Sequence, residues 1–363
     1  MIESVHKAVL LHEVTQLLTG PATVADTFAT RANRNPLVGH APRSVGSVAA
    51  NASASAASTV AASDKSRLLR SEAEQNEETS SWRGGRGGVC YLDGTIGGCG
   101  HALAVAGALK GKVTIVGLDR DPEAIKRAEG TLVGKAEKVI LENENYRNLD
   151  RVLDKHGIET VDLILLDLGL SSDQFESSGR GFSFTKDEPL LMTIGDPASH
   201  PFTAKTIVNE WKEEDIANVI FGYGEERFAR RIAGAIVRYR EKKLIETSGE
   251  LAEIVRLAIP AFARRGKINP ATKTFQALRI AVNDELNALK EGLAKGYARL
   301  SENGRMAVIS FHSLEDKIVK DFYRERAKTA GAKILTKKPV RPSDEEVGKN
   351  PRSRSAKLRV LQK

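Results

Sequence analysis

The stretch YLDGTIGGCGH, Tyr91 to His101, is the first part of the chain whose residue types could bind a ligand. An apolar run ends there in Asp93, and four glycines follow within seven residues. Glycines let the backbone approach a ligand closely and adopt positive φ. A second acid, Asp119, ends the apolar run VTIVGLD, about twenty residues further on, where nucleotide-binding folds place the carboxylate that accepts ribose hydroxyls. The two acids and the glycines therefore predict a site for an adenosine-containing ligand.

The residues after the glycines distinguish two such ligands. A dinucleotide-binding loop needs a small residue at the last position of G-x-G-x-x-G, so that helix and strand can pack closely. Here Gly98 and Gly100 are followed by Leu103 at that position, which disfavours a bound pyrophosphate. S-adenosylmethionine has no phosphate, and its amino-acid end needs polar groups such as Asp93 and backbone amides. We therefore predict S-adenosylmethionine as cofactor, with a nucleotide-dependent oxidoreductase as the alternative.

A third acid, Asp167, ends the apolar run LILLD and is followed by Ser171 and Ser172. The exocyclic amine of a nucleobase is a poor nucleophile because its lone pair is delocalised into the ring. A carboxylate that accepts its N–H bonds localises that lone pair for in-line attack on a methyl group. Asp167 is the leading catalytic candidate, either as this acceptor or as a cofactor contact, and the two serines are candidates beside it. A structural aspartate in a strand-end turn is the alternative interpretation.

The two cysteines, Cys90 and Cys99, narrow the chemistry further. They cannot form a disulfide framework or a four-ligand zinc site. Methylation of carbon five of a pyrimidine usually needs a cysteine nucleophile, and neither residue is well placed, since one lies within the first predicted strand and the other within the glycine loop. Transfer to nitrogen or oxygen is favoured, and no metal is predicted.

Alternating strand and helix patterns surround these residues. The predicted strands are GVCYLDG, KVTIVGLD, EKVILENENY and VDLILLDLG, and the helices between them include HALAVAGALKG and DPEAIKRAEGTL, with Pro122 in its first turn. Repeated strand–helix units indicate a parallel sheet. The predicted fold class is therefore α/β, a Rossmann-like, doubly wound methyltransferase sheet.

The rest of the chain falls into segments of different character. Residues 186–268 read as successive helices without strands and predict an inserted all-helical subdomain. A long helix from residue 269 to 300 then leads back to sheet strands at GRMAVISFH and KLRVLQK. The predicted organisation begins with an N-terminal helix of the methyltransferase domain at 1–20 and an Ala/Ser-rich insertion at 21–87 that we expect to be disordered. The cofactor-binding core follows at 88–185 and continues at 269–363. Between its two parts lies the helical subdomain at 186–268, which we expect to recognise RNA.

The positive charge of the chain indicates which kind of partner it could bind. The net charge is +8 and the pI about 9.3, and basic residues cluster in RFARRIAGAIVRYREKK and in the tail KNPRSRSAKLRVLQK. Such clusters suit a nucleic-acid phosphate surface, although a solvated basic surface is the plain alternative. No run of eighteen apolar residues exists, so we expect no membrane span, and a start without a secretory pattern predicts a cytoplasmic location.

Nine blocks, in the order of the sequence, show a resemblance. They are HKAVLLHEV, DGTIGGCGH, GLDRDPEAI, LLDLGLSSDQ, RGFSF, YGEERFARRIA, NPATKTFQALRIAVNDEL, SFHSLEDKIVK and NPRSRSAKLRV. On these blocks the chain resembles the bacterial 16S ribosomal RNA cytosine-N4 methyltransferase family. The resemblance implies transfer of a methyl group from S-adenosylmethionine to the N4 amine of a decoding-centre cytidine, with 16S ribosomal RNA or the small ribosomal subunit as partner. The cofactor residues it implies are Cys99, Gly100, His101, Asp119, Tyr146, Asp167 and Gln174.

Several further residues are candidates for contact with RNA. Arg227, Arg230 and Arg231 suit phosphates, and Phe182, Phe184 and Tyr223 suit stacking on a base. Lys273, Arg279 and Asn283 either face the RNA or belong to a packed helix, and His312 lies either near the substrate or in a structural turn. A non-catalytic ribosomal RNA-binding assembly factor is the alternative to an enzyme, and the intact Asp93, Asp119 and Asp167 argue against it.

Overall fold

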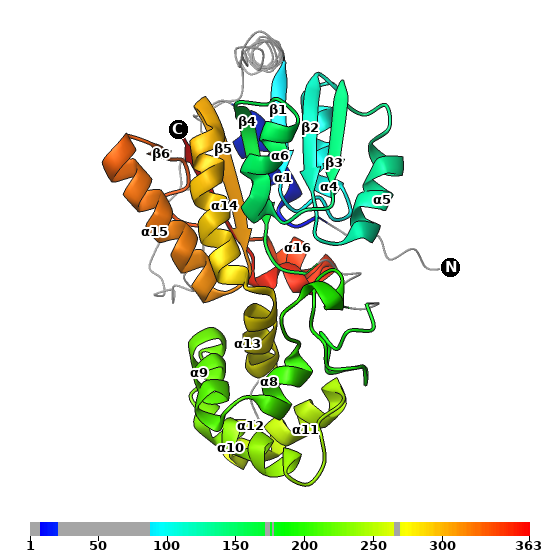
Figure 1. Cartoon of the computed structure of the whole chain (residues 1–363). Helices are drawn as coiled ribbons and strands as arrows, with labels where there is room; N and C mark the ends of the chain where they lie inside the picture. The colour runs from blue at the N-terminus through cyan, green and yellow to red at the C-terminus, as the bar shows by residue number, and fades with distance from the viewer. Residues whose placement is uncertain (1–7, 21–87, 171–174, 176–177, 265–268) are drawn as a thin grey trace, which may run out of the picture.

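The computed structural model describes residues 8–20, 88–170, 175, 178–264 and 269–363. Within these ranges a sheet flanked by helices forms one part, and a group of helices forms the other (Figure 1). The insertion predicted to be disordered, Ser171, Ser172 and Gln174 lie outside the described residues. Of the described helices, none is long and apolar enough to cross a lipid bilayer.

The sheet has seven strands in the order β3-β2-β1-β4-β5-β7-β6. β1 to β5 are parallel, whereas β7 pairs antiparallel with both β5 and β6. The chain crosses over between β3 and β4, so the carboxyl ends of β1 and β4 lie side by side, which is where doubly wound sheets bind ligands. The strand bounds are β1 Val89–Asp93, β2 Val113–Leu118, β3 Lys138–Glu142, β4 Val161–Asp167, β5 Leu300–Ser310, β6 Lys333–Ile334 and β7 Lys357–Gln362.

Helices cover both faces of the sheet because side chains alternate along each strand. Leu163 and Leu165 of β4 pack with α1, α4 and α5, whereas Ile164 and Leu166 pack with α6, α14 and α15. The predicted doubly wound architecture is thus confirmed. These helices are α1 Leu11–Thr19, α4 Gly100–Ala108, α5 Pro122–Leu132, α6 Leu149–Lys155, α14 Glu285–Arg299 and α15 Ser313–Ala330.

The second part is a bundle of helices with its own apolar core. Capping boxes start two of its helices, at Thr203 for α8 and at Thr247 with Glu250 for α11. Ile207, Ile232 and other aliphatic side chains from every long helix of this part meet in one cluster. The helices are α8 Ala204–Glu210, α9 Glu213–Gly224, α10 Ala229–Arg240, α11 Ser248–Ala258, α12 Ala261–Arg264 and α13 Thr272–Asn283.

The packing differs from the predicted segments in two respects. The apolar cluster of the helical part reaches back to Phe182 and forward to Val282, beyond the predicted limits of 186 and 268. In addition, the single helix predicted from 269 to 300 is two helices, because Asp284 adopts a left-handed conformation with φ of 51° between α13 and α14. The break allows α13 to pack in the helical bundle while α14 packs on the sheet.

The segment 8–20 is held against the sheet by hydrogen bonds from distant parts of the chain. The guanidinium of Arg305, in β5, donates to the carbonyls of Leu17 and Gly20 at the end of α1. The backbone N–H of Leu10 donates to Glu346 in α16, Asp344–Lys349. The amino-terminal segment is therefore part of the sheet domain.

Candidate active site

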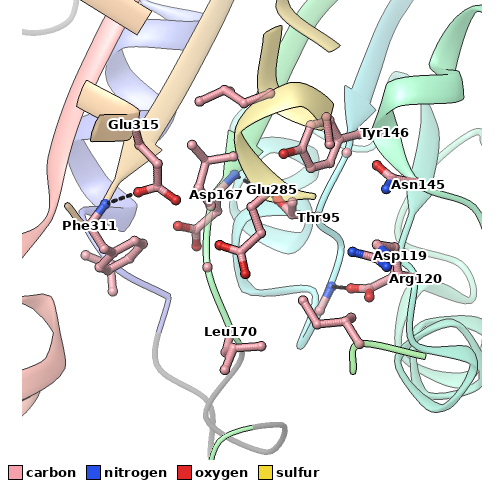
Figure 2. A pocket seen from close by; sticks show the side chains of 18 of the residues that line it. Thr95, Asp119, Arg120, Asn145, Tyr146, Asp167, Leu170, Glu285, Phe311 and Glu315 are labelled. Atoms are coloured by element: carbon pink, nitrogen blue, oxygen red, sulfur yellow. Dashed lines mark hydrogen bonds between the residues drawn. The ribbon is translucent and has the colours of Figure 1, made fainter. Parts of the chain in front are cut away.

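A pocket opens at the carboxyl ends of β1, β2, β4 and β5 (Figure 2). Its wall combines the glycine loop, the acids at the strand ends and the first turns of α14 and α15. The residues named from the sequence that line it are Gly94, Gly97, Asp119, Tyr146 and Asp167. The predicted acids Asp119 and Asp167 therefore share one cavity.

The glycine loop is shaped by close contacts rather than by free space. A Cβ at Gly94 would lie 2.5 Å from Leu166 Cδ2 and 2.9 Å from Tyr146 Cβ, so only glycine lets β1 continue past β4 here. Asp93 lies beneath the loop, where its carboxylate accepts hydrogen bonds from the Tyr91 hydroxyl (2.8 Å) and the Thr95 backbone N–H (3.1 Å). Asp93 does not line the pocket itself, and it fixes the loop from behind.

Burial sets the charge of Asp93. Its side chain is enclosed in the core, and this desolvation raises the pKa of Asp93 to about 6 although the bond from Tyr91 lowers it. The carboxyl group is thus easier to protonate than an exposed one, and a cation placed nearby would favour its ionised form.

Cys99 and His101 lie behind the loop and do not line the pocket. Cys99 precedes α4 in a left-handed conformation, φ 62°, and its side chain is buried in the core. The ring of His101 is also buried, with Nε2 2.9 Å from the carbonyl oxygen of Val9 and Nδ1 3.7 Å from Asp167 Oδ2. A Cβ at Gly100 would approach Ala8 Cβ to 2.8 Å. Gly100 and His101 therefore join the loop to the amino-terminal segment.

Asp119 has the position expected of a ribose-binding acid. Its Oδ2 accepts the N–H of Gly97 (3.0 Å) and its Oδ1 accepts the N–H of Asp121 (2.9 Å). Each oxygen keeps a lone pair for a further donor, since a carboxylate has about four acceptor sites. Desolvation is the largest cause that raises the pKa of Asp119.

Tyr146 forms the wall beyond Asp119. Its ring packs against Gly292 of α14, where an added Cβ would come within 2.6 Å of the ring. Asn145 lines the pocket next to it. A flat ring beside an amide group is a suitable surface for a purine base.

Asp167 is the acid with the least satisfied environment. Its backbone N–H donates to the Thr95 hydroxyl (2.8 Å), which joins the end of β4 to the glycine loop. Its side-chain oxygen Oδ1 is buried and has no hydrogen-bond partner among the described residues. Desolvation is the main cause that raises its pKa well above the usual range, and the charges of Asp93 and Glu315 add to it. A buried acceptor without a donor is costly, so this oxygen marks where a ligand can donate.

Some of the residues predicted to contact RNA are exposed, and others are buried. Arg227, Arg230 and Arg231 are exposed on and before α10, and Lys273 is exposed on α13, where its ammonium donates to the Glu225 carbonyl. These four positions remain available to a phosphate backbone. Arg279 instead donates two hydrogen bonds of 2.8 Å to Glu285, which lines the pocket.

Three of the residues predicted to contact RNA are instead engaged in packing within the protein. Phe182 is buried in the helical core, and Phe184 packs edge-to-face on Phe275 with ring centroids 5.4 Å apart. Asn283 is 3% exposed, and its amide bonds the carbonyl of Met192 (2.7 Å) and the N–H of Ile194 (2.8 Å). It therefore ties α13 to the segment that precedes the helical part instead of facing a ligand.

His312 caps α15 at the edge of the pocket. Its contacts with the backbone are those expected of a residue in a structural turn. Its Nδ1 accepts the N–H of Glu315 (3.4 Å), and the Glu315 carboxylate accepts the N–H of His312 in return.

Sequence reasoning missed several pocket residues. The missed residues are Thr95, Arg120, Asn145, Glu285, Phe311, Glu315, Asn350 and Arg352. Glu285, Glu315 and Phe311 lie within the blocks NPATKTFQALRIAVNDEL and SFHSLEDKIVK, but a helix pattern does not reveal that its first turn points into a pocket. Arg120 follows Asp119 directly and bonds His200 Nε2 at 3.0 Å, which links this edge of the sheet to the helical part.

Comparison with known proteins agrees with this geometry. The model of the MraW methylase family matches residues 3–363. The chain is 43% identical over 293 residues to a "Ribosomal RNA small subunit methyltransferase H" from Brevibacillus brevis, covering 77% of this chain and 93% of that one. It is 46% identical over 290 residues to a protein of the same name from Acetivibrio thermocellus, covering 75% and 92%. Together with the pocket at the ends of β1 and β4, these matches place the chain in the MraW methylase family.

Proposed function

We propose that this protein transfers a methyl group from S-adenosylmethionine to the N4 amine of a decoding-centre cytidine in 16S ribosomal RNA. The observation that carries the proposal is Asp167 Oδ1, a buried acceptor without a donor in the pocket where donor and base must meet. The N–H of an exocyclic amine satisfies this oxygen, and accepting it directs the nitrogen lone pair toward the methyl group.

S-adenosylmethionine is the donor of this family, as predicted from the glycine loop, and the residues of the pocket fit it. The donor supplies an electrophilic methyl group on a positively charged sulfur. Asp119 would accept the ribose hydroxyls, Tyr146 and Asn145 would hold the adenine, and the loop at Gly97 would approach the amino-acid end. The buried Asp93 and Asp167 provide negative charge for the sulfonium, and this charge is unfavourable while the pocket holds no cation.

The acceptor base needs a different aromatic partner from those predicted. Phe182 and Phe184 are part of the helical core, whereas Phe311 lines the pocket at the end of β5, and its ring would lie 3.7 Å from a Cβ at Gly169. We place the target cytosine between Phe311 and Asp167. Reaching it requires the base to leave its stack, which costs a few kcal/mol, and stacking on an aromatic ring returns about 1–3 kcal/mol.

The exposed arginines before and on α10 complete the proposed RNA site. Arg227, Arg230 and Arg231 are exposed just before and on α10, and Figure 1 shows α10 at the end of the helical part remote from the sheet. Phosphate contacts there would orient the RNA without reading its sequence. The small ribosomal subunit or its RNA is therefore the proposed partner.

The proposal is tested by methyl incorporation into small-subunit RNA from a strain that lacks the enzyme. Wild-type protein should label one cytidine, and mass and NMR analysis of the isolated nucleoside should place the methyl group on N4. Asp167→Asn keeps the size of the side chain and should lower turnover about 10²- to 10⁴-fold. Labelling of a different atom, or unchanged turnover in the variant, would contradict the proposal.

The pH dependence gives a second test of Asp167. Its raised pKa means that the free protein holds the proton to a higher pH than an exposed aspartate does. Turnover that depends on the ionised carboxylate should therefore rise with pH, and the rise should be absent from the residual activity of Asp167→Asn. Binding of the positively charged donor should release a proton, which calorimetry in buffers of different ionisation enthalpy detects.

A further inference from the structure

Glu315 is a second acid in the pocket, contributed by the first turn of α15. Its side chain is 4% exposed, and Figure 2 shows its carboxylate in the same cavity as that of Asp167. Oε2 accepts the backbone N–H groups of Phe311 (2.9 Å) and His312 (3.3 Å), which fixes the carboxylate at the end of β5. This end of the sheet is on the acceptor side of Asp167, where we placed the target base.

The contacts of His312 orient the Glu315 carboxylate and favour its ionised form. Its Nδ1 accepts the N–H of Glu315, so in the neutral ring the proton lies on Nε2. Nε2 is 3.2 Å from Glu315 Oε1. This separation allows an electrostatic contact, but Nε2 makes no hydrogen bond to the described residues, so His312 is a positioning residue for the carboxylate through its helix cap.

The other groups that face Glu315 come from four elements. Arg279 of α13 favours its ionised form, whereas Glu285 of α14 and Asp167 of β4 are acids in the same electrostatic neighbourhood. The hydroxyl of Tyr146, the first residue of η2 (Tyr146–Asn148), also lies in this neighbourhood. Burial opposes ionisation most strongly, but His312, Arg279 and the backbone N–H bond together leave the pKa of Glu315 below its usual value. The same pocket thus holds one acid whose pKa is raised and one whose pKa is lowered, the arrangement that separates two carboxyl groups into different roles.

We propose that Glu315 is the base that removes the proton of the methylated amine. This inference rests on the proposed transfer to an exocyclic amine. The amine nitrogen uses its lone pair to form the new N–C bond, and the electron pair of the broken S–C bond stays on sulfur. The nitrogen, now carrying a positive charge, gives one proton to the Glu315 carboxylate and regains its lone pair. Asp167 holds the other N–H through the transfer, and the proton on Glu315 passes to solvent when the product leaves.

A bound cation is the competing use of this cluster. Glu285, His312 and Glu315 each offer a ligand atom, and the three atoms lie within 4.8 Å of one another. However, Arg279 already makes two hydrogen bonds to Glu285, and its positive charge would oppose a metal ion. The geometry therefore favours proton transfer.

The first experiment compares Glu315→Gln with wild type at saturating donor and RNA. Glutamine at this position still accepts the N–H groups of Phe311 and His312, as in a capping box, so α15 should remain capped. We expect turnover to fall about 10²-fold or more, while calorimetry shows unchanged affinity for S-adenosylmethionine. The matched control is Glu325→Gln, the same change on the exposed face of the same helix, which should alter neither quantity.

A second experiment separates proton removal from structure. Glu315→Ala should recover turnover as formate is added, because a small carboxylate can take the vacant place, whereas Asp167→Asn should not respond. Glu315→Asp, which keeps the charge at shorter reach, should be more active than Glu315→Gln. If Glu315→Gln fails to unfold cooperatively, the formate response and the aspartate variant decide the question.

Each outcome has one meaning. Wild-type turnover in Glu315→Gln would overturn the inference, as would a loss of donor affinity that accounts for the whole defect. Loss of wild-type activity in a chelator, restored by a divalent cation, would favour the metal site instead. A methyl group found on an atom other than N4 would refute the proposed function, whereas N4 methylation at an undiminished rate by Glu315→Gln would refute only the role of Glu315.

Discussion

The aspartates at the edge of the sheet and two glutamates of the helical part lie in opposite electrostatic environments. At the sheet edge, Asp93, Asp119 and Asp167 are desolvated, and their pKa values are raised. In the helical part, Glu250 and Glu253 pair with Lys243 and Arg256 near the surface, and their pKa values are lowered.

The difference shows that the energetically unfavourable buried carboxylates lie where a ligand can bind. A buried carboxylate without a cation destabilises the folded protein, and a bound cation removes that penalty. Glu250 and Glu253 in the helical part carry no such penalty, and that part is stabilised by its apolar core. We therefore expect substitutions at the sheet edge to change ligand binding and pH dependence, and substitutions in the helical core to change stability.

The largest expected effect on stability comes from the helical core. Phe182→Ala should lower the free energy of unfolding by about 3–5 kcal/mol, because it removes a buried aromatic side chain. Phe311→Ala, at the pocket, should lower stability less and turnover more. Urea unfolding and methyl-transfer rates measured on both variants check the contrast, and a catalytic defect in Phe182→Ala without loss of stability would break it.

A gain in stability is expected at the sheet edge. The folded-state pKa of Asp93 is about 6 against 3.8 for an unperturbed aspartate, so the free energy of unfolding falls as pH rises from about 4 to above 6. The difference corresponds to roughly 3 kcal/mol at most. Asp93→Asn should therefore stabilise the donor-free protein at pH 8 by up to about 3 kcal/mol and have little effect near pH 4.

The same variant should bind S-adenosylmethionine more weakly, because it lacks the negative charge beneath the loop. Thermal unfolding at the two pH values, with and without the donor, measures both effects. Destabilisation of Asp93→Asn at pH 8 would show that the hydrogen bonds from Tyr91 and Thr95 outweigh the buried charge.

The smallest effect on the folded protein is expected at the exposed arginines. Replacing Arg227, Arg230 and Arg231 with alanine should leave donor affinity unchanged and weaken RNA binding most at low salt. If all three contact phosphates, the slope of log K against log salt should decrease by about 2–3. Arg256→Ala is the control, since Glu253 already pairs with that guanidinium. An unchanged slope in the triple variant would place the RNA on another surface.

The sequence predicted the parts of the molecule that depend on local pattern. Alternating strands and helices gave the doubly wound sheet, and acids at the ends of apolar runs indicated Asp119 and Asp167 in one pocket, because carboxyl ends of neighbouring parallel strands meet at one edge. The family resemblance, read from blocks spread along the chain, is confirmed by the match over residues 3–363.

Residue type alone did not distinguish residues of the apolar core from residues that line the pocket. Phe182 and Phe311 are both aromatic residues in segments that follow a strand, and only the packing shows that the first is in the helical core and the second lines the pocket. The break at Asp284 was equally hidden, since a left-handed aspartate within a helical pattern is imposed by the separate packing of α13 and α14. Glu315 was overlooked because its spacing from His312 is that of an ordinary helix cap.

The pocket also draws on both ends of the described chain. Val9 contributes to its wall and holds His101, while Asn350 and Arg352 contribute from the segment just before β7. During synthesis, a ribosome must therefore deliver the chain at least as far as Arg352 before this cavity can close around a small molecule. A growing chain that has not yet reached this segment holds the glycine loop and its acids but lacks one wall of the pocket.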